Sequence, residues 1–343
     1  MKRLLNTLYV TFPNRYLSLD GENVVVLEKE TEIGRIPLHN LEAIVTFGYT
    51  GASPALMGAC ASRGICLTFL SGSGRFLARV TGEVYGNVIL RKTQYRISEN
   101  PEASLEIAKN CVTGKVYNSR WILERALRDH PLRLDVEKLQ EKSRFLQETL
   151  KKIQGCSSAS SLLGLEGEAA SVYFSVFDDL ILQQKDDFPF HGRNRRPPTD
   201  AVNAMLSFAY TLLTSMCASA LETVGLDPYV GFYHTDRPGR KSLALDLVEE
   251  LRSVLADRFV LTLINKKVVS KEGFQQKENG AVVMDETLRK TFLTAWQKKK
   301  QEMITHPFLG EKVEWGMVPY VQAMLLARYL RGDLDAYPPF FWK

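Results

Sequence analysis

The segment with the clearest chemical potential runs from Gly231 to Arg252 and reads GFYHTDRPGRKSLALDLVEELR. A histidine, His234, precedes a basic loop and a predicted helix that carries Asp246 and Glu249. These two acids are three residues apart and therefore project from one helix face. Carboxylate oxygens suit Mg²⁺ or Mn²⁺, and one imidazole shifts the preference slightly toward Mn²⁺. The pattern predicts a divalent cation used in phosphate chemistry, with Glu166 of SLLGLEGEAA as a further candidate ligand.

A solvated helix face is the simpler explanation of Asp246 and Glu249, because exposed helices commonly carry acids. The apolar surroundings favour the metal, since a buried carboxylate needs a cation or a hydrogen-bond partner. Glu250 points about 100° away on the helix and is interpreted as a surface residue. His234 alone would more often be an ordinary loop histidine. The metal prediction therefore depends on the combination of histidine, basic loop and acids.

Basic residues cluster near these candidate ligands, and phosphates explain such clusters beside a metal. The residues predicted to contact DNA are Arg193, Arg195, Arg196, Arg237, Arg240 and Lys241. Two further residues, Asn203 and Tyr210, lie seven positions apart on one predicted helix face and are weaker candidates for the site. The alternative is that both only pack. The lysine run 298–300 is better explained as a solvated helix face.

The composition is that of an ordinary globular protein, with 45% hydrophobic and 24% charged residues in 343. A net charge of +5 permits an acidic partner without requiring one. The five cysteines include no CxxC pair, which argues against a zinc site and favours reduced thiols. No apolar run approaches the ~18 residues of a membrane span. These features predict a cytoplasmic protein.

The spacing of apolar residues changes along the chain and predicts an α+β, multidomain architecture. Residues 1–85 read as a small β domain with short strands at 5–12, 16–19, 24–27, 33–37, 43–47, 65–70 and 76–80. Ser53, Pro54 and Gly64 predict one capped helix within it. Residues 86–98 are expected to be a linker. Residues 99–343 are expected to form a larger all-α catalytic domain with helices at 105–126, 136–153, 159–182, 201–223, 243–255, 287–304 and 320–330.

Three motifs in order, LLGLEG, RNRRPPTDAVNAMLSFAYTLL and GFYHTDRPGRKSLALDLVEELR, resemble the core endonuclease–integrase family of CRISPR adaptation. That family inserts new spacers into the repeat array. The resemblance covers essentially the whole chain, and LNTLYVTFPNRYLSLDGENVV is similar to the branch that accompanies type I-C systems. It implies metal ligation by Glu166, His234 and Asp246. It also implies a further acid at Glu249, whose contact with the metal, direct or through water, stays open.

The resemblance also implies partners and a substrate. It implies a homodimer assembled through the β domains, with two dimers bridged by a small companion protein. The implied substrates are double-stranded DNA fragments with free 3′-hydroxyl ends and the CRISPR repeat. The expected reaction is a metal-dependent transesterification, with hydrolysis when water replaces the hydroxyl. Two alternatives stay open: a stand-alone metal nuclease acting on branched DNA or RNA, and a non-catalytic DNA-binding scaffold that holds a structural ion.

Overall fold

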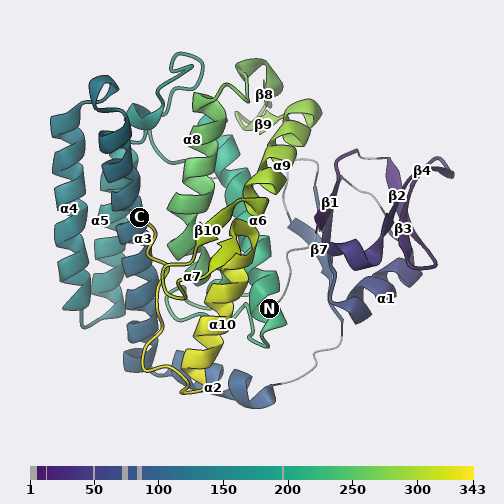
Figure 1. Ribbon diagram of the computed structural model, residues 1–343, viewed down its shortest axis with the longest axis horizontal. Helices are drawn as coiled ribbons and strands as arrows, with labels where there is room; N and C mark the ends of the chain where they lie inside the picture. Colours follow the sequence, from purple (N-terminus) through teal and green to yellow (C-terminus); the bar gives the residue numbers. More distant parts are fainter. Residues whose placement is uncertain (1–5, 13, 49–50, 72–75, 83–86, 195–196) are drawn as a thin grey trace.

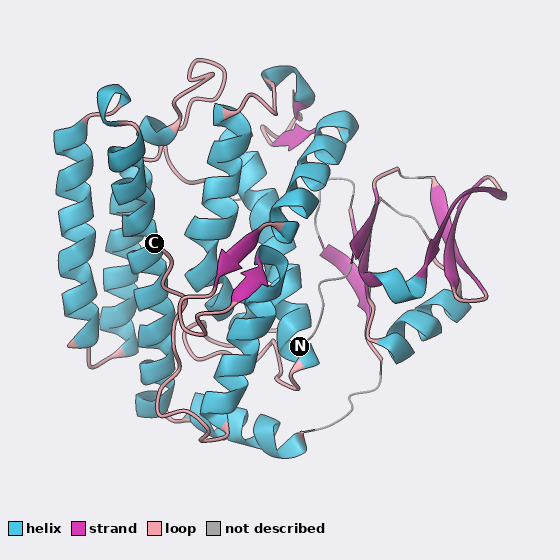
Figure 2. Cartoon of the chain, viewed as in Figure 1, coloured by secondary structure: helices cyan, strands magenta, loops and turns pink. Residues whose placement is uncertain are grey.

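The computed structural model describes residues 6–12, 14–48, 51–71, 76–82, 87–194 and 197–343. Two units lie side by side in Figure 1: a β unit (6–82) and a larger helical unit (87–343). Figure 2 shows that most strands are confined to the β unit. The α+β class expected from the sequence is confirmed.

The β unit consists of two small sheets and one helix. A mixed sheet has the order β1 (Asn6–Val10), β5 (Leu41–Phe47), β6 (Cys66–Leu70) and β7 (Phe76–Val80). In it β1, β5 and β6 are parallel, and β7 is antiparallel to β6. An antiparallel sheet joins β2 (Arg15–Asp20), β3 (Asn23–Glu28) and β4 (Thr31–Pro37). A shared apolar core that includes Leu17, Ile44 and Leu67 holds the sheets together. All the predicted strands are present.

Helix α1 (Pro54–Arg63) shows the predicted capping chemistry. The Ser53 hydroxyl accepts a hydrogen bond from the Leu56 amide at 3.2 Å, and Pro54 occupies the first position. Gly64 ends the helix at φ +66°, a left-handed conformation that glycine adopts without strain. The predicted helix is therefore confirmed at both ends.

The helical unit has one large apolar core, formed by long helices and continued into the β unit by Val45, Phe47 and Leu70. Their bounds are α2 (Val88–Glu99), α3 (Pro101–Asp129), α4 (Val136–Gln154), α5 (Ala159–Ser175), α6 (Ala201–Thr223), α7 (Ser242–Leu251), α8 (Arg258–Asn265), α9 (Glu286–Gln301) and α10 (Val318–Leu330). Short 3₁₀ turns occupy Leu38–Asn40, Pro131–Arg133, Asp178–Leu180, Lys271–Gly273 and Trp315–Met317. A π-helical segment, Arg252–Asp257, joins α7 to α8. Such wide turns often occur at functional sites.

Two hairpins depart from the all-α expectation for this unit. They pair β8 (Phe274–Gln276) with β9 (Val282–Met284), and β10 (Met303–Thr305) with β11 (Lys312–Glu314). Each strand is only three residues long. Segments this short do not establish an alternating pattern that sequence analysis can recognise.

The linker expected at 86–98 is wrong over most of its length, because residues 88–99 form α2. The Asn87 side chain caps this helix by accepting a hydrogen bond from the Leu90 amide at 3.1 Å. Gln94 is fully buried, donates to the Asp227 and Val230 carbonyls at 2.8 Å, and accepts from the Asp227 amide at 2.9 Å. A glutamine at the buried position obscured the apolar periodicity. Helix α2 therefore belongs to the helical unit.

Helix α6 is more apolar than the sequence analysis recognised. Of the described helices, it alone is long and apolar enough to span a membrane, with a mean hydropathy of 1.5. Within that window, 61% of the residues are buried in the protein, and the helix packs against α7 and α10. We interpret it as the central core helix of the helical unit.

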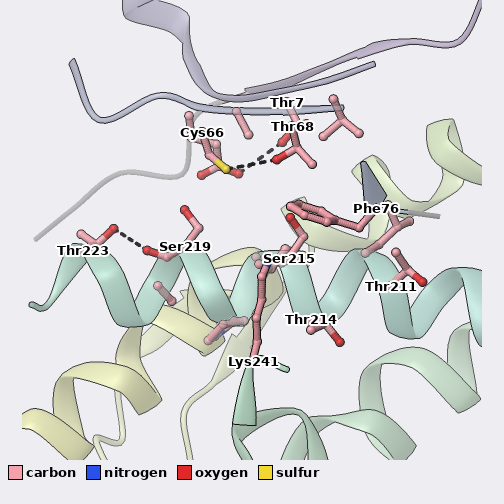
Figure 3. A pocket seen from close by; sticks show the side chains of 18 of the residues that line it. Thr7, Cys66, Thr68, Phe76, Thr211, Thr214, Ser215, Ser219, Thr223 and Lys241 are labelled. Atoms are coloured by element: carbon pink, nitrogen blue, oxygen red, sulfur yellow. Dashed lines mark hydrogen bonds between the residues drawn. The ribbon is translucent and has the colours of Figure 1, made fainter. Parts of the chain in front are cut away.

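A cavity of ≈660 Å³ lies between the β unit and α6. Figure 3 shows Ser215 and Ser219 of α6 facing Cys66 and Thr68 of β6 across it. Ion pairs connect the two units beside the cavity. The buried Lys300 ammonium lies 2.7 Å from a Glu42 carboxylate oxygen, and Arg79 pairs with Glu222.

The last residues of the chain fold back over α3 and α7, so that the C-terminus lies beside α3 in Figure 1. The Glu250 carboxylate accepts hydrogen bonds from the Tyr337 hydroxyl at 2.5 Å, the Phe340 amide at 2.8 Å and Gln322 Nε2 at 3.0 Å. Burial raises the pKa of Glu250 to about 7, against the lowering effect of these donors. The interpretation of Glu250 as a surface residue is therefore wrong. It points away from Glu249 as expected, but into a second buried contact.

Candidate active site

Asp246 holds the loop that carries His234. Its Oδ2 atom accepts from the Phe232 amide at 2.7 Å and the Tyr233 amide at 3.0 Å. Its Oδ1 atom accepts from the His234 amide at 2.9 Å and lies 2.7 Å from His234 Nδ1. Because Nδ1 donates to a carboxylate, the imidazole presents the lone pair of Nε2 to a ligand. Asp246 therefore positions both the loop and the ring.

Gly231 allows this loop to pass tightly over α7. A side chain there would place its Cβ 2.8 Å from Ser242 Cβ and 2.9 Å from Asp246 Oδ2. Contacts this short are not tolerated without movement of the backbone. The glycine is therefore required for the approach of the loop amides to Asp246.

Glu249, one helical turn after Asp246, points to a different set of neighbours. Its Oε2 atom lies 2.6 Å from the Lys115 ammonium of α3, and the same ammonium pairs with Glu166 Oε1 of α5. All three side chains are largely buried, with exposed fractions of 7% for Lys115, 14% for Glu166 and 10% for Glu249. Three helices thus bring two carboxylates and one ammonium together.

The charge of Glu249 is fixed by its neighbours. Burial alone would raise its pKa, but the Lys115 ammonium and the Arg252 guanidinium outweigh burial and lower the pKa to about 2. His234 contributes in the same direction. Glu249 is therefore an anion throughout the physiological range.

Tyr233 completes the cluster. Its hydroxyl donates to Glu166 Oε2 at 3.2 Å. Burial raises the pKa of Tyr233, and the carboxylates of Glu166 and Glu249 raise it further. The phenol therefore stays protonated and donates to Glu166.

The donor set fits a hard divalent cation, because two carboxylates and one imidazole nitrogen are its usual ligands. As the side chains stand, no three His, Cys, Asp or Glu residues among the described positions are close enough to hold a metal. The Lys115 ammonium instead lies between Glu166 and Glu249 and stands in for the cation. A metal would use Glu166, Glu249 and His234, and Lys115 would have to move.

A chain of buried polar groups extends behind Glu249. Arg252 lies 3.4 Å from Glu249 Oε2 and donates to the Tyr210 hydroxyl at 3.1 Å. The Tyr210 hydroxyl in turn donates to Asp257 Oδ1. Tyr210 therefore acts through Arg252 and Asp257 and does not contact the carboxylate cluster directly. Tyr210, predicted from the sequence as a weak candidate for the site, is therefore a positioning residue.

Asn203 and Arg193 fasten the loop before α6. The Arg193 guanidinium donates to Asn203 Oδ1 at 2.6 Å and to the Ser207 hydroxyl at 3.1 Å. The fully buried Asn203 also donates to the Gly192 carbonyl at 2.8 Å. These bonds give Arg193 a structural task, and its binding to DNA stays a prediction. Arg195 and Arg196 lie outside the described residues.

The basic residues after His234 are divided between two locations. Arg237 is exposed, whereas Arg240 and Lys241 line the cavity between the units. The Lys241 ammonium lies 4.3 Å from the centre of the Phe76 ring. Burial lowers the pKa of Lys241. Contact of these residues with DNA stays a prediction.

The sequence analysis missed Lys115, Tyr233 and Arg252. Lys115 is a lysine in the otherwise apolar run CVTGKVY, an anomaly that indicated burial without naming a partner. Tyr233 is adjacent to His234, but only the folded loop shows that its hydroxyl reaches Glu166. The partners come from different helices, and residue spacing does not encode such contacts.

Asp246→Asn is expected to impair catalysis without abolishing it. An amide keeps one carbonyl acceptor but loses the charge and one of the two acceptor atoms that hold residues 232–234. Loss of such an outer-shell support typically costs about 10- to 100-fold in activity or metal affinity. Rates and metal affinity of the purified variant check this. An unchanged rate would show that Asp246 does not position His234.

Comparison with known proteins places this geometry in a family. The family model described as "CRISPR associated protein Cas1" matches residues 8–298. The chain belongs to the Cas1 family. A relative from Rhodospirillum rubrum, named CRISPR-associated endonuclease Cas1 2, is 53% identical over 347 residues, which is 100% of each chain. The family resemblance drawn from the three sequence motifs is thereby confirmed.

Solved structures of Cas1-like fold agree with this architecture. A casposase bound to integration product matches with a TM-score of 0.84 and 24% identity, over 96% of this chain and 92% of the casposase chain. A chain of a Cas6-RT-Cas1–Cas2 complex matches with a TM-score of 0.84 and 22% identity, over 100% of this chain and 36% of that chain. At these identities the likeness establishes the fold alone.

Proposed function

We propose that this Cas1 family member is a metal-dependent DNA endonuclease and integrase. It joins the 3′-hydroxyl ends of short double-stranded DNA fragments to a CRISPR repeat by transesterification. The observation that carries the proposal is the convergence of the largely buried Glu166 and Glu249 carboxylates on one cation, the Lys115 ammonium. His234 follows Tyr233, whose hydroxyl donates to Glu166, and its own Nδ1 atom is engaged by Asp246.

The geometry favours Glu249 over Asp246 as the direct ligand. Among the described residues, the hydrogen bonds of Asp246 go to the loop amides and to His234 Nδ1, whereas Glu249 shares the Lys115 ammonium with Glu166. We therefore propose Glu166, His234 and Glu249 as ligands of Mg²⁺ or Mn²⁺. Direct ligation by Asp246, which the family resemblance implied, is the less favoured assignment.

The chain's own residues prepare the site for reaction at phosphorus. When bound, the cation polarises a phosphoryl oxygen and lowers the pKa of the attacking hydroxyl. His234 is held in the tautomer that leaves Nε2 available, and Tyr233 orients Glu166 through its hydroxyl. Arg252 keeps Glu249 ionised and fixed. Because these groups are already oriented, they do not have to reorient during the reaction. Electrostatic preorganisation of this kind usually makes the largest contribution to catalysis.

We further propose that basic side chains bind the DNA backbone. These are Arg193, Arg195, Arg196, Arg237, Arg240 and Lys241, which would give salt-dependent affinity with little base recognition. A homodimer formed through the β units, bridged by a small companion protein, is part of this proposal. The structural neighbour from a Cas6-RT-Cas1–Cas2 complex supports the companion. Membership of the type I-C branch is likewise proposed.

A joining assay tests the proposal. A labelled fragment with 3′-hydroxyl ends is incubated with a repeat-bearing plasmid, the protein and its companion, with Mg²⁺, Mn²⁺, Ca²⁺ or EDTA. We expect joined products with Mg²⁺ or Mn²⁺, DNA binding without turnover in Ca²⁺, and no product in EDTA. Full activity in metal-free protein, verified by elemental analysis, would refute metal dependence.

The same assay distinguishes the competing functions. A stand-alone nuclease would give hydrolysed products from branched DNA or RNA and no joined strands. A DNA-binding scaffold would bind the fragment with unchanged affinity in every metal and give neither product. A fragment with a 3′-deoxy end is the control, because it cannot supply the attacking hydroxyl.

A further inference from the structure

Lys115 occupies an unusual place for a lysine. It extends from α3 into the carboxylate cluster, with 7% of its side chain exposed, and pairs with both Glu166 and Glu249. Burying an ammonium is unfavourable unless anions compensate it, and here two carboxylates do. Both belong to the ligand set proposed above. A metal and this ammonium cannot occupy one position, because both require the same oxygen atoms.

A second position for the ammonium exists nearby. A small cavity of ≈10 Å³ is lined by Lys115 together with Tyr173, Arg252 and Asp257. A cavity of that volume holds about one water molecule, which is similar in size to an ammonium group. The Oδ2 atom of Asp257 and the Tyr173 hydroxyl are both buried at this cavity, and among the described residues neither has a partner within ideal hydrogen-bond geometry. The Tyr173 hydroxyl can donate to this oxygen, and the second lone pair of the oxygen leaves room for an ammonium donor.

We propose that Lys115 is a displaceable counter-ion with two positions. In the metal-free protein it bridges Glu166 and Glu249, and a divalent cation displaces it toward Asp257. Its four-carbon side chain has the rotational freedom that such a movement needs. In the absence of metal, the lysine keeps the two carboxylates close together. It also competes with the metal, so the site binds metal more weakly than the same carboxylates would if the lysine were absent. This inference rests on the metal site of the proposed function.

Metal binding measured without DNA tests the proposal. Calorimetric titration with Mn²⁺ is performed on the wild type, Lys115→Met, Asp257→Asn and the double variant. If the ammonium occupies the site in at least nine molecules of ten, its removal raises the Mn²⁺ affinity about tenfold or more. Asp257→Asn removes the receiving charge and is expected to weaken binding in the wild type. In the Lys115→Met background, Asp257→Asn should not change the Mn²⁺ affinity, because no ammonium moves toward Asp257.

Two further variants keep the result interpretable. Lys300→Met is the matched control, since it also removes a buried ammonium paired with a carboxylate, but at the junction of the two units. It should leave the Mn²⁺ affinity unchanged. Lys115→Gln retains a hydrogen-bond donor for the two carboxylates and serves if Lys115→Met does not fold. It is expected to bind Mn²⁺ more tightly than the wild type.

The outcomes separate this inference from the proposed function. Unchanged or weaker Mn²⁺ binding by both Lys115 variants, with clear binding by the wild type, refutes the displaceable counter-ion alone. An equal effect of Asp257→Asn in both backgrounds refutes the second position. Absence of Mn²⁺ binding in the wild type and in every Lys115 variant refutes the metal site itself, and this inference with it.

Discussion

Glu249→Gln is expected to abolish strand joining and DNA cleavage together, with rates at least about a thousandfold lower. The substitution keeps the shape of the side chain but removes the charge that, with Glu166, would hold the catalytic cation. A loss of ~4 kcal/mol of transition-state stabilisation corresponds to that factor. Single-turnover joining and cleavage of labelled DNA, with circular dichroism to verify folding, measure the effect. Glu166→Gln should behave in the same way.

A neighbouring acid provides the control for this experiment. Glu168 lies two residues from Glu166 on α5 but is exposed, so Glu168→Gln should retain full activity. The experiment also decides between the two acids of α7. If Glu249→Gln stays active while a folded Asp246→Asn is inactive, Asp246 is the ligand and our reassignment is wrong.

Glu250→Ala is expected to destabilise the helical unit by roughly 4 kcal/mol. The carboxylate receives three hydrogen bonds from Tyr337, Phe340 and Gln322, and all these donors are buried around it. Truncation leaves the Tyr337 hydroxyl and the Phe340 amide without this acceptor and creates a cavity, whereas Gln322 Nε2 keeps the Pro338 carbonyl at 3.1 Å. For a unit of this size the melting temperature should fall by roughly 10 °C. Thermal unfolding and urea titration check the value.

The control for stability is Glu278→Ala, because Glu278 is exposed between β8 and β9. Its effect should stay within about 0.5 kcal/mol. Glu250→Gln should be intermediate, since the amide oxygen still accepts one or more of the bonds. If Glu250→Ala has the same melting temperature as the wild type, the contact of Glu250 with Tyr337 and Phe340 does not contribute to stability.

Local sequence patterns correctly predicted most of the helices and strands. The ends of α1 follow from Ser53, Pro54 and Gly64, whose effects act within a few residues. Helix α2 was missed because Gln94, at a buried position, takes its partners from residues 227–230, more than 130 positions away. A polar residue satisfied by a distant backbone is indistinguishable in sequence from an exposed one.

The candidate site shows the same limit. The 3.6-residue period correctly separates the directions of Glu249 and Glu250. It does not show that both directions are buried, because residues from α3, α5 and the last segment of the chain cover them. Likewise, Asp246 and Glu249 share a helix face, yet one binds loop amides and the other a lysine. Only tertiary contacts distinguish their tasks.

The contact of Glu250 with the last residues of the chain also affects the order in which parts of the protein fold during its synthesis. Tyr337 and Phe340 follow Glu250 by 87 and 90 positions. A nascent chain that has reached only α10 already contains Glu166, His234 and Glu249. In that chain the adjacent Glu250 carboxylate still lacks two of its three main donors. Such long-range closure is slow relative to local helix formation. The helix that bears Glu249 therefore acquires its final support late, which delays completion of the cluster of Lys115, Glu166 and Glu249.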